Sequence, residues 1–134
     1  MANRLEEFRR FRERMNERIL EAGNLEIKRF FALDGRTYEA GALDTRTKEL
    51  LGLVASMVLR CDDCITYHIV RCKEEGVGDD EFFEAFSVGL IVGGSIVIPH
   101  LRRAVDTLDE INARAAEDAG ALDELTDGAA EVEA

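Results

Sequence analysis

The sequence predicts an all-α protein, folded as a compact bundle of about six helices. Apolar residues recur at spacings of three and four along most of the chain, which is the period of an α-helix. Glycines and aspartates divide these segments at places typical of helix ends. β-branched runs such as 95–98 are short and are flanked by helical periodicity, so we expect no strand.

Length and composition indicate one globular domain. The chain has 134 residues, of which 46% are hydrophobic and 34% are charged, a normal balance for a soluble protein. Its net charge of −11 argues against binding to nucleic acid or to anionic membranes. The longest apolar run, 88–98, is too short to span a bilayer, and the charged N-terminus is unlike a signal peptide. Because the three cysteines come without a secretion signal, we expect a cytoplasmic location.

The N-terminal part is expected to form two helices. Residues 1–23 predict an amphipathic helix that stops at Gly23. A shorter helix is expected over 25–33, followed by a turn at Asp34-Gly35.

The middle of the chain is expected to form a pair of helices. Asp44 is predicted to cap a strongly apolar helix that runs to Leu59. The next helix carries the cysteines and is predicted to run to about Glu75, with Gly76 as its C-terminal cap.

Two more helices are expected before the C-terminal segment. Asp79 or Asp80 is predicted to cap a helix through about Val92, which Gly93-Gly94 breaks. The last helix is expected over 95–115, with Pro99 near its start.

The C-terminal segment 117–134 is rich in Ala, Gly, Asp and Glu without an apolar stripe, and we expect it to be a disordered acidic tail. The predicted organisation is therefore an N-terminal helix over 1–23, a helical domain over 24–116 and this tail.

The segment from Phe82 to Leu101 is apolar on several faces, more than a surface helix needs. It is expected either to cross the centre of the monomer or to lie at a subunit interface. We expect a homo-oligomer, because a small monomer has few partners for so many apolar side chains.

The residues that suggest chemistry are gathered between Glu49 and Cys72. Cys61 and Cys64 form a Cys-x-x-Cys pair, and His68 follows Cys64 at the i,i+4 spacing that lets an imidazole reach a thiol. Two antiparallel helices that turn near Cys61 would bring Glu49 close to His68. A carboxylate there would orient the histidine. Cys61 would then lie at a helix N-terminus, where free N–H groups lower a thiol pKa.

Other interpretations of these residues remain open. If the spacing of Cys61 and Cys64 is accidental, the two cysteines are simply small buried hydrophobic residues. Cys72 is best explained as a packing residue. A metal site using Cys61, Cys64 and His68 is the main competing chemistry, but one helix would separate Cys61 from Cys72 by ~16 Å, too far for one tetrahedral zinc ion. His100 could be a helix cap, an interface residue or an outer group of the site.

The spacing Glu49-x11-Cys61-x2-Cys64-x3-His68 resembles the motif of the alkylhydroperoxidase D-like branch of the carboxymuconolactone decarboxylase family. The flanking Asp44–Leu50, Asp79–Ala85 and Gly93-Gly94 are similar to the family's neighbouring helices. The resemblance covers roughly residues 25 to 112.

This resemblance implies a homotrimer or homohexamer with thiol-dependent peroxidase or disulfide reductase activity and an antioxidant role. Its catalytic residues would be Cys64, Cys61, His68 and Glu49. Decarboxylase members lack the cysteine pair, which disfavours that activity here. We expect a peroxide substrate and an external dithiol or thiol-protein reductant, with no bound cofactor or metal. The alternatives are a metal-binding protein and a non-catalytic helical assembly module.

Overall fold

The structure is a computed structural model that describes residues 4–133, with side chains described to residue 123. Its described part is all-helical, as the sequence predicts. The helices are α1 (Arg4–Ala22), α2 (Leu25–Thr37), α3 (Thr45–Val58), α4 (Asp62–Glu74), α5 (Asp79–Gly93) and α6 (Ile98–Glu133), with a 3₁₀ turn η1 (Ser95–Val97) before α6. No helix in this part is long and apolar enough to cross a membrane.

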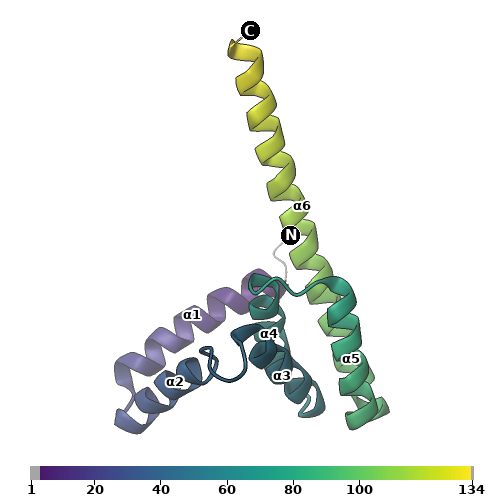
Figure 1. Cartoon of the computed structure of the whole chain (residues 1–134). Helices are drawn as coiled ribbons and strands as arrows, with labels where there is room; N and C mark the ends of the chain where they lie inside the picture. The colour runs from purple at the N-terminus through teal and green to yellow at the C-terminus, as the bar shows by residue number, and fades with distance from the viewer. Residues whose placement is uncertain (1–3, 134) are drawn as a thin grey trace.

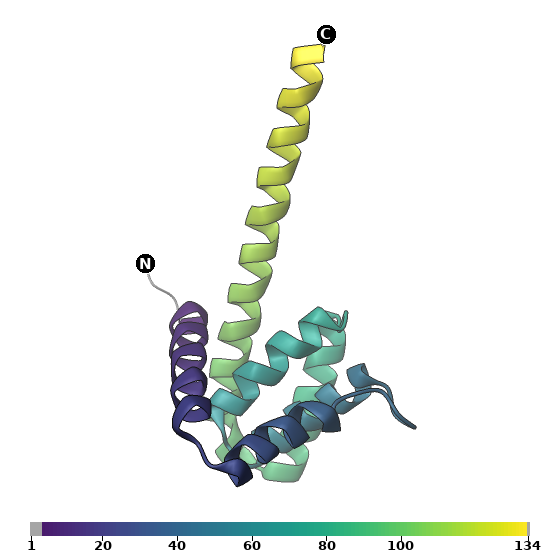
Figure 2. The same cartoon turned by 90° about the vertical axis from the view of Figure 1, so that its left-hand side faces the viewer.

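The helical body is built around α3 and α4. Helix α3 packs against α4 and α5, while α4 packs against α6. Helices α1 and α2 extend to one side of this body, and α6 leaves it as a long rod (Figures 1 and 2). The core consists of buried side chains from α3 to α6 and their connections: Leu53, Met57, Ile65, Ile69, Cys72, Val77, Phe82, Phe86, Val97, Ala104 and Leu108.

Three helix ends follow the expected capping chemistry. The side chain of Asp44 accepts a hydrogen bond from the Thr47 N–H at 2.7 Å, so it caps α3 as predicted. Cys61 is the N-cap of α4. Gly76 follows α4 with a φ of 83°, a left-handed conformation that suits glycine at a helix end.

The predicted turn at Asp34-Gly35 is wrong, because α2 continues through it to Thr37. A glycine weakens a helix by only about 1 kcal/mol, which other contacts offset here. Asn24 caps the start of α2, and the ammonium of Lys48 donates to the carbonyl of Thr37 at 2.9 Å.

The cap of α5 also differs from the prediction. Gly78 is the N-cap, and Asp79 and Asp80 lie in the first turn. The Gly78 N–H donates to the Glu81 carboxylate at 3.0 Å. The side chain that caps this helix N-terminus therefore comes from the first turn of α5 itself.

The segment after residue 117 was expected to be disordered, but in the structure it is helical, because α6 runs through it to Glu133. Ala, Leu and Glu are strong helix formers, and they extend a helix that the core has already started at Ile98. The expected domain boundary at 116/117 therefore falls inside one helix.

The apolar segment 82–101 divides between core and surface. Phe82, Phe86 and Val97 are buried, whereas Ile91 is 84% exposed. Other apolar side chains of this region are exposed on α3 and directly after it, on α5, on η1 and at the start of α6, and we call them the apolar face: Leu51, Leu59, Phe83, Val88, Ile91, Val92, Ile96 and Ile98. The expectation that this segment crosses the centre of the monomer therefore holds for its buried residues. The alternative, a subunit interface, stays a prediction.

Candidate active site

Helices α3 and α4 form an antiparallel hairpin that brings Glu49 to His68. The chain reverses between them with Arg60 in a left-handed conformation, at a φ of 59°. Glu49 Oε2 lies 2.8 Å from His68 Nδ1, and both side chains are buried. The prediction that a hairpin would join these two residues is confirmed.

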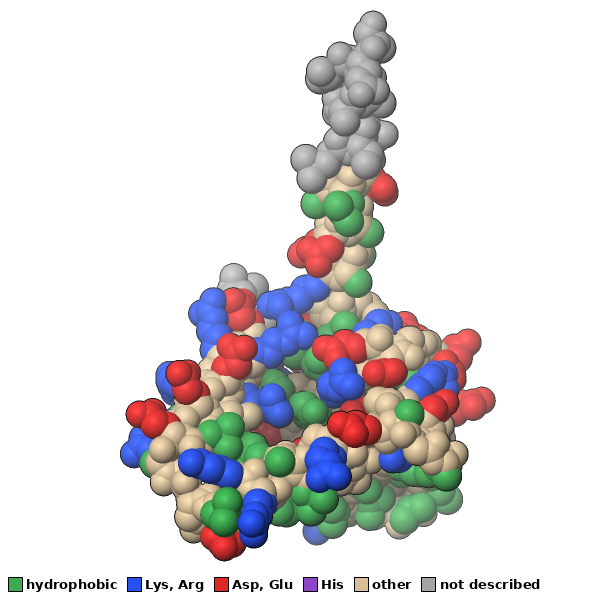
Figure 3. All heavy atoms as spheres, turned by 60° about the vertical axis from the view of Figure 1, so that its left-hand side comes forward, with side chains coloured by type: hydrophobic (Ala, Val, Ile, Leu, Met, Phe, Trp, Pro, Cys, Tyr) green, Lys and Arg blue, Asp and Glu red, His purple; other side chains and the backbone are tan. Residues whose placement is uncertain are grey.

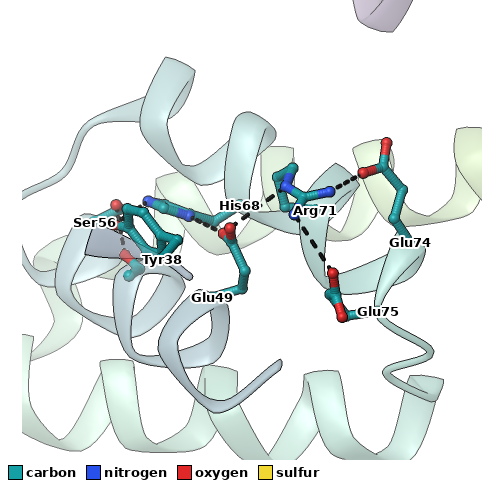
Figure 4. Close-up of polar contacts among 8 residues, drawn as sticks. Tyr38, Glu49, Ser56, His68, Arg71, Glu74 and Glu75 are labelled. Atoms are coloured by element: carbon teal, nitrogen blue, oxygen red, sulfur yellow. Dashed lines mark hydrogen bonds and ion pairs between the residues drawn. The ribbon is translucent and has the colours of Figure 1, made fainter. Parts of the chain in front are cut away.

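Glu49 is a fully buried carboxylate held by two basic groups (Figure 4). One oxygen contacts His68, and the other lies 3.4 Å from Nε of Arg71, close enough for an ion pair but not aligned for a hydrogen bond. Arg71 in turn contacts Glu74 and Glu75 at the end of α4. A buried carboxylate needs such partners, and Arg71 supplies the second of them beside His68.

The contact with Glu49 determines the direction of the imidazole. A carboxylate only accepts hydrogen bonds, so Nδ1 of His68 carries the proton that it donates to Glu49. In the neutral ring, Nε2 is then free to accept a proton. The hydroxyl of Tyr38 lies 3.4 Å from Nε2 and can donate to it.

Tyr38 reaches the site from the loop that follows α2, 30 positions before His68 in the sequence. Burial raises the pKa of its hydroxyl, and the negative charges of Asp34 and Glu49 add to this rise. Tyr38 therefore stays a protonated donor toward His68. Sequence reasoning missed this residue, because a lone loop tyrosine shows neither periodicity nor motif spacing.

The cysteine pair lies at the start of α4 and is oxidised. Cys61 and Cys64 form a disulfide with Cα atoms 5.2 Å apart, and the Cys64 N–H donates to Cys61 Sγ at 3.2 Å. Cys64 is exposed. No hydrogen bond joins His68 to Cys64 among the described residues, although both line the same cavity. In the disulfide, Cys64 has no proton to donate to His68.

Cys72 is the remaining cysteine, and it is free and buried in the core. Burial, with a smaller contribution from Glu49, raises the pKa of its thiol to about 12. The thiol is therefore protonated and unreactive near neutral pH, as expected for a packing residue.

A cavity of about 600 Å³ opens in front of Cys64 and His68, between α1 and α4. Arg12 of α1 lies over the ring of Tyr67 of α4, with its Cζ 4.6 Å from the ring centroid. Figure 3 looks toward this side of the molecule, where hydrophobic side chains lie between Lys and Arg side chains. The lining comes mostly from α1 and α4: Arg4, Glu7, Phe8, Phe11, Arg12, Met15, Asn16, Asp34, Asp63, Cys64, Tyr67 and His68.

A second polar cluster joins the start of α4 to α6. Asp62 lies between the two cysteines in sequence, and its Oδ1 is 2.7 Å from Nδ1 of His100. Nη1 of Arg103 is 3.3 Å from the other carboxylate oxygen. His100, for which the sequence left several roles open, is thus a partner of the residue next to Cys61.

The metal-site alternative has no geometric support in the part of the chain with described side chains. No three His, Cys, Asp or Glu side chains there come close enough together to hold an ion. Cys61 and Cys64 are joined to each other, and His68 faces Glu49 and Tyr38.

Comparison of the sequence with known families gives one match over most of the chain. The profile of the carboxymuconolactone decarboxylase family matches residues 26–107, which include α3, α4, α5 and the four motif residues. A curated relative, uncharacterised protein 4 of the cox locus of Paracoccus denitrificans, is 32% identical over 83 residues, covering 62% of this chain and 75% of its own length.

Solved structures share this fold. A Thermotoga maritima protein is 56% identical, with a TM-score of 0.82 and coverage of 84% of this chain and 98% of that one. A second crystal structure of the same protein, 57% identical with a TM-score of 0.78, covers 85% of this chain and 95% of that one. Its description is a family protein with a suggested part in an antioxidative response. A Legionella pneumophila family protein is 18% identical with a TM-score of 0.75, covers 81% of this chain and 97% of that one, and supports the fold alone.

Proposed function

The chain belongs to the carboxymuconolactone decarboxylase family, and on that premise we propose that it is a thiol-dependent peroxidase or disulfide oxidoreductase of the alkylhydroperoxidase D-like kind. One observation is the main support for this proposal. The Cys61–Cys64 disulfide has Cys64 exposed on a cavity that it shares with His68, whose ring is oriented by a buried carboxylate. A redox-active pair needs this combination of access and a nearby base.

The proposed reaction begins with the reduced pair. His68, oriented by Glu49, takes the proton of Cys64 at Nε2, directly or through a water. The Cys64 thiolate attacks a peroxide oxygen, the O–O bond breaks, and the leaving alkoxide takes a proton to become an alcohol. Cys64 is now a sulfenic acid. The thiol of Cys61 displaces its hydroxyl as water and forms the disulfide.

An external dithiol completes the cycle. Its thiolate attacks the disulfide to give a mixed disulfide, and its second thiol releases the reduced pair and leaves as an oxidised disulfide. The attack falls most easily on Cys64, because Cys64 is exposed whereas Cys61 is only partly exposed. The scheme needs no bound cofactor, and it gives the protein an antioxidant role.

The cavity favours an organic peroxide as the substrate. Phe8, Phe11 and Met15 of α1 present apolar side chains to it, and a volume of about 600 Å³ exceeds what hydrogen peroxide needs. An alkyl or aryl hydroperoxide would place its apolar part against α1 and its peroxide group near Cys64. The N-terminal helix, which lies outside the segment matched by the family profile, would thus shape the substrate site.

Association of identical chains is the second part of the proposal. The exposed apolar face around Ile91 draws its side chains from α3, α5 and η1, and α5 packs against both α3 and η1. Burying one large apolar side chain is worth roughly 1.5–3 kcal/mol, so covering this face would stabilise a closed oligomer. We propose a homotrimer or homohexamer.

Peroxide consumption with a dihydrolipoyl-type dithiol tests the function. The wild type should consume an organic hydroperoxide catalytically, and Cys64→Ser should abolish turnover. Cys72→Ser is the matched control, since it removes a thiol that is buried outside the cavity. If Cys61 and Cys64 fail to cycle with any peroxide or disulfide, the assembly-module alternative is favoured instead.

A further inference from the structure

The cluster of Asp62, His100 and Arg103 bears on the acidity of the cysteine pair. Asp62 opens α4 next to Cys61, and its carboxylate is held from α6 by His100 at 2.7 Å and by Arg103 at 3.3 Å. His100 and Arg103 come from a helix that starts 36 positions after Asp62, so only the packing of α4 on α6 makes this contact.

A carboxylate beside a thiol opposes the formation of the thiolate. The free N–H groups at the start of α4 favour a thiolate at Cys61, whereas Asp62 and Asp63 in the first turn disfavour it. Other charges near this end of α4 are those of Arg60 in the turn and of Arg103 on α6. Three charged residues of α1, Arg4, Glu7 and Arg12, line the same cavity as Asp63 and Cys64. The balance among these groups decides how acidic the pair is.

His100 weakens the effect of Asp62. Because a carboxylate only accepts, Nδ1 of His100 carries the hydrogen that it donates to Oδ1, whether the ring is neutral or charged. This donation, with the guanidinium of Arg103 on the other oxygen, offsets the negative charge next to Cys61.

We propose that His100 is a positioning residue which, with Arg103, keeps the thiols of Cys61 and Cys64 acidic by holding and partly neutralising Asp62. This deepens the proposed function, because it assigns a residue of α6 to the control of the same cysteine pair. It also predicts the direction of the redox equilibrium. Two electrons and two protons convert the disulfide to the dithiol, and a less acidic pair favours the disulfide at a given ratio of reductant to oxidant.

The test is a titration of the reduced protein by thiolate absorbance at 240 nm. Cys72 does not interfere below about pH 10, since its pKa is about 12. His100→Ala should raise the apparent pKa of the pair by about half a unit or more, and Asp62→Asn should lower it by a similar amount. His100→Lys keeps a hydrogen-bond donor for Asp62 and should not raise the pKa above the wild-type value.

The double variant separates this role from a structural one. If the contact were only structural, His100→Ala and Asp62→Asn would change the thiol pKa in the same direction. Both variants would then differ from the wild type mainly in thermal stability. The proposal requires opposite shifts, and it requires that His100→Ala has no further effect in the Asp62→Asn protein. Arg102→Gln is the control, since Arg102 is exposed on the same helix and makes no contact with Asp62 among the described residues.

Equilibration with glutathione buffers gives a second reading of the same proposal. His100→Ala should leave a smaller reduced fraction of the pair than the wild type at one fixed ratio of thiol to disulfide. If His100→Ala does not fold, Arg103→Gln tests the same direction with a milder change. An unchanged thiol pKa in the folded variants, or an equal shift in the Asp62→Asn background, overturns the proposal.

Neither measurement uses a peroxide, so the two proposals fail separately. A protein without peroxidase activity but with the expected thiol shifts would refute the proposed function and leave the role of His100 standing. Peroxidase activity in the wild type with an unchanged thiol pKa in the variants would support the proposed function and refute the role of His100.

Discussion

The ring of His68 lies against Gly52, in the space that a side chain would occupy on any other residue. A Cβ on Gly52 would lie 2.6 Å from Cε1 and 2.8 Å from Nε2 of His68. Gly52 follows Glu49 by one helical turn, so the same face of α3 supplies both the carboxylate that orients the ring and the gap that admits it.

Gly52→Ala should therefore displace His68 from Glu49. We expect peroxide turnover to fall by about 10²-fold, the cost that misplacing a catalytic group by about 1 Å can have. Steady-state kinetics with an organic hydroperoxide measures this. Gly35→Ala is the matched control, because Gly35 lies in α2 with nothing within 4 Å of its added Cβ. It should keep full activity and gain up to about 1 kcal/mol of stability. Full activity in Gly52→Ala would contradict the assigned position of His68.

Glu49 and His68 should act as one unit. Glu49→Gln and His68→Gln should each slow thiol turnover by about 10²-fold, the usual scale of general acid–base help. The double variant should lose little more, since either change already breaks the 2.8 Å contact. Rapid-mixing measurement of Cys64 oxidation by peroxide gives the rates. Losses that add fully in the double variant would argue against a relay.

Phe11 should matter for large substrates only. Phe11→Ala removes an apolar side chain from the cavity wall, so KM for cumene hydroperoxide should rise several-fold while kinetics with hydrogen peroxide stay unchanged. Phe30→Ala serves for comparison, because Phe30 is 68% exposed on α2 and does not line the cavity. If Phe11→Ala affects both peroxides equally, α1 does not form part of the substrate site.

Deprotonation of Cys72 should lower the free energy of unfolding at alkaline pH. Its thiol pKa is raised from 9.0 to about 12, mainly by burial, so the folded protein holds this proton more tightly than the unfolded chain. The stabilisation is fully present below about pH 9 and is lost as the pH rises toward about 12. Urea unfolding at several pH values should show that the stability advantage of the wild type over Cys72→Val shrinks across this window. An advantage that stays constant would show that Cys72 does not titrate in this way.

The exposed apolar face predicts association. The wild type should be a homo-oligomer at micromolar concentration by light scattering, and Ile91→Glu should weaken it, since Ile91 is 84% exposed in the isolated chain. Removing residues 118–134 should leave the oligomer intact, because the proposed interface lies on α3, α5 and η1. A wild-type protein that stays monomeric would refute this interface.

The relationships that the sequence alone reveals are those within one helix or one hairpin. Cys61, Cys64, His68 and Cys72 share α4, where the spacing of residues sets which side chains lie near one another. The pairing of Glu49 with His68 needed one further step, a tight reversal between two helices, and the polar break near Cys61 indicated where this reversal occurs.

The remaining groups of the site come from distant segments, and only the tertiary structure identifies them. Tyr38 reaches His68 from a loop, Arg12 reaches Tyr67 from α1, and His100 reaches Asp62 from α6. None of these contacts follows from helical periodicity, which predicts the face of a helix but not its partner. The partner depends on how the apolar faces of all the helices are buried together, and that is a property of the whole chain.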